Sequence, residues 1–176
     1  MRRLHLYFAD DPLSSAELTA ACLDGHLVAL GEAYIPADAV ETAALRAGSL
    51  SLLLGKTLAA AGRTAAWVHG ALIDPPARHR VQRVSVRRLH HVVNRQLEYH
   101  DTRLPEHDVM VIGGVCVTTP VRTLVDLARS AREIDHLAAR ALLRARVVRT
   151  QEGAAWLEAA GIVPGKRRAH ERLRSW

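Results

Sequence analysis

The strongest folding signal in this chain lies near its middle, in residues 103–128. Residues 108–118 are rich in β-branched side chains, and Gly113-Gly114 at their centre supplies the positive φ angles of a two-residue hairpin turn. Thr119 is a favourable helix N-cap, and Pro120 suits the first helical position because it lacks an N–H group. The stretch therefore predicts two antiparallel strands followed by a helix that begins at Pro120.

Several residues in the predicted helices are expected to have structural roles. Arg122 and Asp126 are four residues apart, so their side chains are neighbours and can pair to orient the helix against its sheet. Upstream, Thr64 is expected to cap a second short helix that places Trp67 in the core. His69 follows without a second ligand in view, so we expect a hydrogen-bonded structural histidine.

Composition bounds the class of protein. Apolar residues make up 49% of the 176 residues, enough to bury the core of one domain or two small ones. The two cysteines, Cys22 and Cys116, lie in apolar patterns, which indicates buried free thiols in a reducing compartment. Asp10 and Asp11 interrupt any secretion signal, and no apolar stretch approaches the roughly 20 residues of a membrane span. We expect a cytoplasmic protein without a membrane partner.

The N-terminal part, residues 1–62, is acidic and mostly helical by pattern. It holds four basic and seven acidic residues, a net charge of −3. A capped helix ending at Gly25 is followed by an apolar strand pair with Glu32 in its turn. Residues 37–62 then have the Ala/Leu-rich pattern of one or two helices.

The remaining residues, 63–176, carry a net charge of +9, from 20 basic and 11 acidic residues. Residues 75–97 contain no acidic side chain, and residues 83–88 alternate Val with Arg or Ser, which predicts a half-buried strand with a basic outer face. Such a face suits nucleic-acid phosphates, and the alternative is a merely solvated face.

Histidines and carboxylates in the same region raise the question of a metal or nuclease site. The histidines lack the tight spacing of zinc ligands, and His90 and His91 would point to opposite faces of a regular strand. The carboxylates form no recognisable catalytic motif. We expect no metal, no cofactor and no enzymatic activity. The histidines considered are His90, His91, His100 and His107, and the carboxylates are Glu98, Asp101, Glu106 and Asp108.

Three helices are predicted after the central one. Residues 133–149 have an amphipathic pattern, a short helix spans residues 151–160, and the tail from residue 161 is basic, with Arg168 and Arg172 among its cations. The tail helix is either solvated or phosphate-binding. The apolar stripe of the first helix comprises Ile134, Leu137, Ala138, Ala141, Leu142 and Ala145.

The sequences TTPVRTLVDLA and TAAWVHGAL resemble the core of the AbiEi-type antitoxin family of type IV toxin–antitoxin systems. A similar core occurs in actinobacterial proteins that continue into a very-short-patch-repair-like endonuclease domain, which we do not expect in this protein. The resemblance implies a winged helix-turn-helix at the N-terminus, autoregulation of an operon and a nucleotidyltransferase toxin as partner. The wing of such proteins usually carries basic residues, whereas this chain has Glu32, so the N-terminal part either contacts DNA weakly or has a packing role.

These observations predict an α+β fold. A winged-helix-like module (residues 1–62) is expected to pack on a basic α+β domain (residues 63–176) with a small antiparallel or mixed sheet covered by helices. We expect a non-enzymatic DNA-binding transcriptional regulator that contacts double-stranded DNA through arginine side chains. The alternatives are a module that binds an acidic protein partner or toxin, and a nuclease remnant. The predicted DNA-binding residues are Arg78, Arg80, Arg83, Arg87, Arg88, Arg168 and Arg172.

Overall fold

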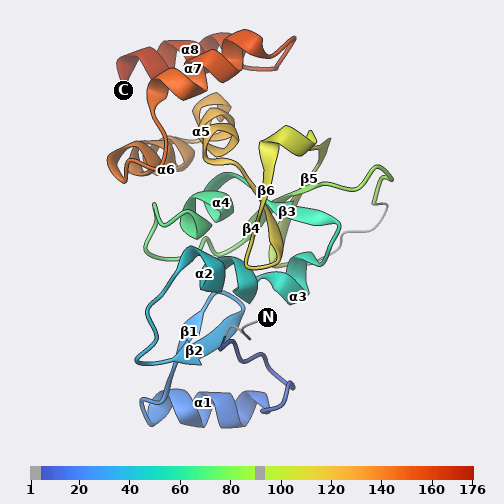
Figure 1. The fold of residues 1–176 in the computed structure, drawn as a ribbon, viewed down its shortest axis with the longest axis vertical. Helices are drawn as coiled ribbons and strands as arrows, with labels where there is room; N and C mark the ends of the chain where they lie inside the picture. The colour runs from blue at the N-terminus through green and yellow to red at the C-terminus, as the bar shows by residue number, and fades with distance from the viewer. Residues whose placement is uncertain (1–4, 90–93) are drawn as a thin grey trace.

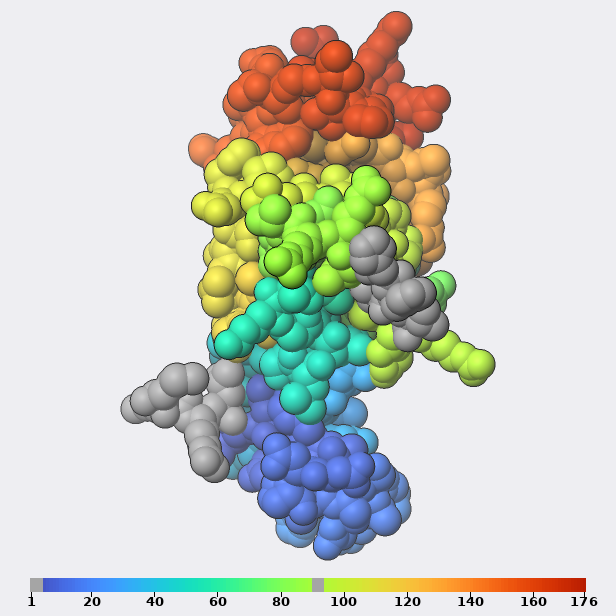
Figure 2. Space-filling model, turned by 90° about the vertical axis from the view of Figure 1, so that its right-hand side faces the viewer, coloured from blue at the N-terminus to red at the C-terminus, as the bar shows by residue number. Residues whose placement is uncertain are grey.

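The structure is a computed structural model that describes residues 5–89 and 94–176. Its elements are stacked along one long axis, with the N-terminal helix at one end, a five-stranded sheet in the middle and the last two helices at the other end (Figure 1). Figure 2 shows the same order from the side, from the N-terminal elements in blue to the C-terminal helices in red. The combination of helices with two sheets confirms the predicted α+β class.

The first elements agree with the predicted order of helix and strand pair. Helix α1 (Ser15–Leu23) begins with a capping box between Ser14 and Glu17, and Gly25 after it has a φ of 76°. Strands β1 (Leu27–Leu30) and β2 (Ala33–Pro36) then form an antiparallel pair.

The prediction of helix through residue 62 is wrong in its last part. Helices α2 (Ala43–Ser49) and α3 (Ser51–Leu54) are followed by strand β3 (Leu58–Ala60). Gly55 ends α3 with a φ of 56°. The three residues of β3 are buried, and pairing with strands on both sides overrides the helical propensity of Leu and Ala. The boundary expected after residue 62 stays a prediction, and β3, which precedes it, is hydrogen-bonded into the central sheet.

The central sheet is mixed, in the order β5-β4-β3-β7-β6. Strands β4 (His79–Arg83) and β5 (Leu97–Arg103) are parallel, as are β3 and β7 (Val115–Thr118), whereas β3 pairs antiparallel with β4. Strand β6 (Val109–Ile112) forms the predicted hairpin with β7, and Gly113 and Gly114 have φ angles of 55° and 84°.

The sequence predicts a strand at residues 83–88, but the strand of this region, β4, is formed by His79–Arg83. Strand β4 ends at Arg83, where its register with β5 shifts, and residues 84–89 leave the sheet as a loop. The Val84 N–H still bonds to the Thr57 carbonyl, but Val86 is 74% exposed. The alternation of Val with Arg therefore does not reflect burial of one face.

Helix α4 (Gly62–Val68) begins two residues before the predicted cap. Ala61 is the N-cap, so Thr64 lies within the helix, where its hydroxyl accepts the Arg80 backbone N–H at 2.9 Å. Trp67 is fully buried, which confirms its role in the core. The Nε2 of His69 donates to the Thr118 carbonyl at 2.8 Å, as expected for a structural histidine.

Helix α5 (Pro120–Arg129) begins as predicted, with the Thr119 hydroxyl accepting the Arg122 N–H. Helix α6 (Glu133–Arg144) ends five residues earlier than expected, and Arg146 after it has a positive φ of 54°. Ile134 and Leu137 of its predicted apolar stripe are about half exposed, because the helix turns Asp135 inward instead. The remaining elements are the 3-10 helix η1 (Glu106–Asp108) and helices α7 (Thr150–Ala159) and α8 (Lys166–Ser175).

Two apolar clusters hold the structure together. The first joins Leu30 and Ile35 of the strand pair to Trp67 and to one face of the central sheet. The second lies among helices α5 to α8 and includes Leu124 and Leu157. Both cysteines are free thiols. In the part of the chain that the structure describes, no helix combines the length and apolarity that crossing a membrane requires.

Candidate functional site

The arginines of the predicted basic strand are held in place by specific contacts. Arg78, at the start of β4, donates its Nε to the Arg95 carbonyl at 3.1 Å and a second nitrogen to the Leu97 carbonyl at 2.6 Å. These bonds join the start of β4 to the start of β5. Arg78 is an exposed side chain with a bracing role at this end of the sheet.

Arg83 has an acidic partner from the neighbouring strand. Its Nε lies 2.7 Å from Oδ1 of Asp101 on β5, and its Nη1 donates to the carbonyls of Ser85 and Val86 at 2.9 and 3.1 Å. An acidic residue of the neighbouring strand therefore neutralises part of the positive charge of residues 75–97, contrary to the expectation from the sequence. Arg83 braces the loop that follows β4.

This braced loop presents Arg87 and Arg88 to solvent. The Ser85 hydroxyl donates to the Arg87 carbonyl at 2.8 Å, which adds a second internal bond to the loop. Arg88 is 73% exposed, with its Nε 3.4 Å from Asp101. A hydrogen bond from Tyr99, together with the charges of Arg83 and Arg88, holds the pKa of Asp101 below its ordinary value.

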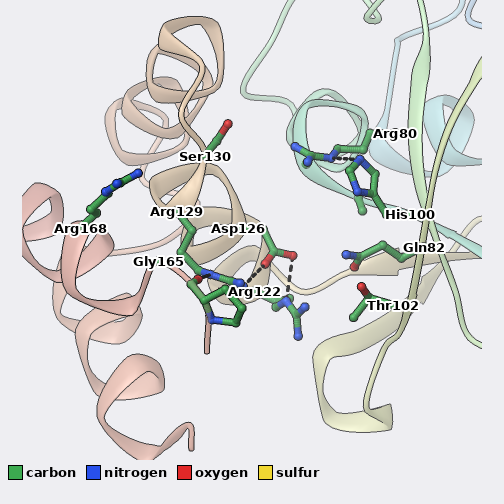
Figure 3. A pocket seen from close by; sticks show the side chains of 13 residues that line it. Arg80, Gln82, His100, Thr102, Arg122, Asp126, Arg129, Ser130, Gly165 and Arg168 are labelled. Atoms are coloured by element: carbon green, nitrogen blue, oxygen red, sulfur yellow. Dashed lines mark hydrogen bonds and ion pairs between the residues drawn. The ribbon is translucent and has the colours of Figure 1, made fainter. Parts of the chain in front are cut away.

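The face of β4 and β5 opposite the pair of Arg83 and Asp101 borders a cleft of about 380 Å³. Side chains of a strand alternate between faces, so Arg80 and Gln82 of β4 and His100 and Thr102 of β5 point to the cleft. Helix α5 and the α7–α8 turn form the opposite wall (Figure 3). Arg80 donates its Nε to His100 at 3.2 Å and lies 3.5 Å from the buried carboxylate of Asp135.

The two predicted arginines of the tail have different positions. Arg168 lines the cleft from α8 and is exposed. Arg172 is half-buried and donates to the carbonyls of Ala128 and Ser130 at 2.6 and 2.7 Å, which satisfies acceptors at the end of α5. The structure thus places Arg80 and Arg168 at the same cleft, with Arg172 bonded to Ser130 at its edge, and Arg83 and Arg88 at the same carboxylate, whereas Arg78 contacts the start of β5.

The predicted pair of Arg122 and Asp126 is confirmed at 2.8 Å and belongs to a larger buried group. A second guanidinium nitrogen of Arg122 lies 2.6 Å from Asp108, which also accepts the indole N–H of Trp156 at 2.8 Å. The ring of Trp156 stacks on the guanidinium, 5.3 Å from its centroid. This group joins η1, α5 and α7, which is a structural role.

The candidate nuclease carboxylates do not converge. Glu98 and Asp101 lie on opposite faces of β5, and Asp108 is taken up by Arg122. Residues 5–89 and 94–176 contain no group of three His, Cys, Asp or Glu side chains that could hold a metal ion. The expectation for His90 and His91 lies outside the described residues.

Sequence reasoning missed most of the cleft. Gln82 and Thr102 belong to no recognisable motif. Once the strands are known, the alternation of side chains between the two faces of β4 and β5 places them beside Arg80 and His100. Arg129, whose Nη1 lies 3.1 Å from Asp126, comes from a helix far away in sequence, and no local signal connects it to the strands.

Residues 58–174, more than half of the chain, match the AbiEi antitoxin C-terminal domain family. The chain belongs to this family, which confirms the resemblance seen in the sequence. A comparison with curated proteins finds none that matches the chain. Membership gives the chain a role in toxin–antitoxin systems, and antitoxins of this family are not typically enzymes. The match begins at Leu58, the first residue of β3, so the central sheet lies within the matched domain.

Proposed function

We propose that this chain is a DNA-binding transcriptional regulator of a toxin–antitoxin operon, and that the loop after β4 contacts DNA phosphates. The observation that carries the proposal is the bracing of this loop by Arg83, which leaves Arg87 and Arg88 exposed at the end of the sheet. Arginine side chains donate to phosphate oxygens in two directions, and a braced loop loses little conformational entropy when it binds. Family membership supports the regulatory role.

The seven predicted arginines have different parts in this proposal. Arg87 and Arg88 contact phosphates directly. Arg78 and Arg83 stabilise the conformation of this surface and donate their remaining N–H groups to the DNA backbone. Arg80, Arg168 and Arg172 lie at or near the cleft and contribute to the positive field rather than to direct contact.

The N-terminal module has a packing role in this proposal. Glu32, in the turn between β1 and β2, accepts hydrogen bonds from His79 and from Gln96 of the central domain. The tip of a wing that is docked in this way does not reach a DNA groove. The acidic charge of the module also opposes phosphate binding. Of the two roles open from the sequence, intramolecular packing is therefore favoured.

The protein partner in this proposal is a cognate toxin, a nucleotidyltransferase by analogy with the AbiEi-type systems that the sequence resembles. The counteraction of the toxin and the binding of DNA are separate activities. A nucleotidyltransferase gene beside the gene for this chain is the expected genomic context. Its absence would favour the alternative of a module that binds another acidic protein.

Fluorescence anisotropy tests the DNA contact. The full chain is titrated against a duplex from the upstream region of its own gene and against a scrambled duplex, at two salt concentrations. We expect tighter binding to the upstream duplex. Replacement of both Arg87 and Arg88 by Ala should weaken binding to both duplexes and reduce the slope of log K against log salt by about 2.

The matched control is the double variant Arg144→Ala and Arg174→Ala, which removes the same charge from exposed positions on α6 and α8. It should change the salt slope much less. An unchanged slope in the Arg87 and Arg88 variant would remove the loop from the interface. Lack of binding by the wild-type chain would overturn the DNA proposal and favour a protein partner.

A further inference from the structure

The cleft beside α5 collects arginines from three separate elements. Arg80 comes from β4, Arg122 and Arg129 from α5, and Arg168 from α8, whereas Asp126 is the only carboxylate that lines the described part of the cleft. Figure 3 shows Arg80 and Arg168 on opposite walls, with Asp126 between Arg122 and Arg129. The loop proposed to contact DNA is not part of this cleft.

The carboxylates around the cleft are shared between arginines. Asp126 pairs with both Arg122 and Arg129, at 2.8 and 3.1 Å. Asp135 lies 3.2 Å from Arg63 and 3.5 Å from Arg80. Arg122 and Arg80 each have a second carboxylate, Asp108 and Glu98 respectively. Arg129 has only its share of Asp126, and Arg168 has no acidic partner among the described residues, so the excess of positive charge lies at these two arginines.

The same excess appears in the titration of two groups at the cleft. Burial lowers the pKa of Arg129; attraction by Asp126 opposes this, while repulsion by Arg122 and Arg80 adds to it. Burial tends to raise the pKa of Glu98, but a hydrogen bond from His100 and the charges of nearby arginines lower it overall. The pKa of Arg122, in contrast, is raised by its two carboxylates, Asp126 and Asp108, against the effect of burial. The repulsion that Arg129 receives from Arg122 and Arg80 is the part of these shifts that favours an anion beside Arg129.

Arg168 and the start of α8 point to where that anion sits. The guanidinium of Arg168 has no hydrogen bond or ion pair with the described residues, although it lines the cleft. Helix α8 begins at the cleft after Gly165, without a capping side chain in the part of the chain described. Uncapped backbone N–H groups and the helix dipole add to the preference for negative charge.

Gln82 indicates that the ligand is more than a simple anion. Its side-chain oxygen is buried and has no hydrogen-bond partner among residues 5–89 and 94–176. Figure 3 shows the Gln82 amide directed from β4 into the space between strands and helices. A buried acceptor without a donor is costly, so the site favours a ligand that carries an O–H or N–H group beside its anionic group.

We propose that the cleft binds a nucleotide through its phosphate, with Arg168, Arg129 and Arg80 around the phosphate oxygens and Gln82 accepting from the sugar or base. The cleft volume of about 380 Å³ lies at the small end of ordinary ligand pockets and fits one nucleotide unit. The unit is either a free nucleoside monophosphate or the 5′-phosphorylated end of a strand. This site is independent of the proposed DNA contact through Arg87 and Arg88.

Isothermal titration calorimetry of the full chain at low ionic strength tests the proposal, with inorganic phosphate, the four nucleoside 5′-monophosphates and the corresponding nucleosides as probes. We expect weak binding of phosphate and about tenfold tighter binding of at least one monophosphate. The nucleosides should bind poorly because they lack the phosphate. A short 5′-phosphorylated RNA distinguishes the two sources. If it binds as tightly as the best monophosphate or more tightly, the ligand is the end of a strand; if it does not bind, the ligand is a free nucleotide.

Two variants separate the two parts of the site. Arg168→Gln changes an exposed side chain and should weaken phosphate and nucleotide binding alike, by about tenfold or more. Gln82→Leu should weaken nucleotide binding but leave phosphate binding unchanged. The Arg87 and Arg88 double variant should bind nucleotide as the wild type does, so failure of the DNA proposal leaves this one standing.

Three results would overturn the proposal. The first is no detectable binding of phosphate or of any monophosphate by the folded wild-type chain. The second is nucleotide binding that persists unchanged in Arg168→Gln and is lost in the Arg87 and Arg88 variant, which places the ligand on the loop. The third is equal affinity for a nucleoside and its monophosphate. Circular dichroism of each variant establishes that it is folded.

Discussion

Asp108 and Arg122 form a buried ion pair with 2.6 Å between Oδ2 and Nη1. Asp108 is 1% exposed, and its other oxygen accepts from Trp156. The pair joins the turn before β6 to helix α5, and thereby the sheet to the helical layer above it (Figure 1). The position of the cleft depends on this joint, because Arg122 also lines the cleft.

Asp108→Asn is expected to lower the free energy of unfolding by about 3 kcal/mol, because it leaves the Arg122 charge buried with one partner fewer. Urea denaturation measures the change. Asp101→Asn is the control, since Asp101 pairs with Arg83 at the surface and should cost about 1 kcal/mol or less. Equal effects of the two substitutions would contradict the structural role of Asp108.

The hairpin turn between β6 and β7 packs against the N-terminal part of the chain. A Cβ atom on Gly113 would lie 2.3 Å from the backbone oxygen of Ala44 in α2, whereas a Cβ atom on Gly114 would meet no described atom within 4 Å. Both glycines have positive φ angles, so a residue with a side chain at either position would have a strained backbone.

Comparison of the two alanine variants isolates the contact with α2. Gly114→Ala should lower the free energy of unfolding by about 1 kcal/mol, from backbone strain alone. Gly113→Ala should cost about 3 kcal/mol, because the clash with Ala44 is added. Thermal unfolding followed by circular dichroism measures both. If the two midpoints shift equally, α2 does not pack on the hairpin as described.

The sequence predicted the elements whose information is local. The hairpin and helix α5 depend on a glycine pair, a capping threonine and a proline that act within a few residues of each other. These signals agreed with one another, and the structure follows them closely. The cap of α1 and the turn at Gly25 were predictable for the same reason.

The missed features depend on contacts between distant segments. Residues 58–60 have helical composition, yet they form the central strand because β4 and β7 pair with them from both sides. Arg83 has an acidic neighbour only because β5 runs parallel to β4 and brings Asp101 beside it. The cleft is likewise assembled from the strands and from helices α5 and α8, so no window of sequence contains it.

The contact between the strand-pair turn and the central sheet is expected to depend on pH through His79. Its Nε2 donates to Glu32 at 3.2 Å, while its Nδ1 is buried and has no partner among the described residues. Trp67, 6.5 Å away between ring centroids, covers one side. Burial lowers the pKa of His79 below its ordinary 6.5, although the hydrogen bond and charge of Glu32 oppose this.

Because folding lowers the pKa of His79, the stability of the folded state is expected to decrease as the pH falls. A histidine with a lowered pKa in the folded state binds its proton more readily when the chain is unfolded. Its contribution to stability is therefore fully present above pH 6.5 and is lost as the pH falls from 6.5 through the folded-state pKa. Burial also lowers the pKa of His69, against its bond to Thr118, and adds to the same trend.

We expect the free energy of unfolding of the wild type to decrease between pH 7.5 and pH 5. In His79→Gln, whose amide can still donate to Glu32 but does not titrate, the decrease should be smaller. His26→Gln, at an exposed position, is the control and should follow the wild type. Urea denaturation at a series of pH values measures all three. A wild-type slope retained in His79→Gln would show that His79 is not the group that couples this contact to pH.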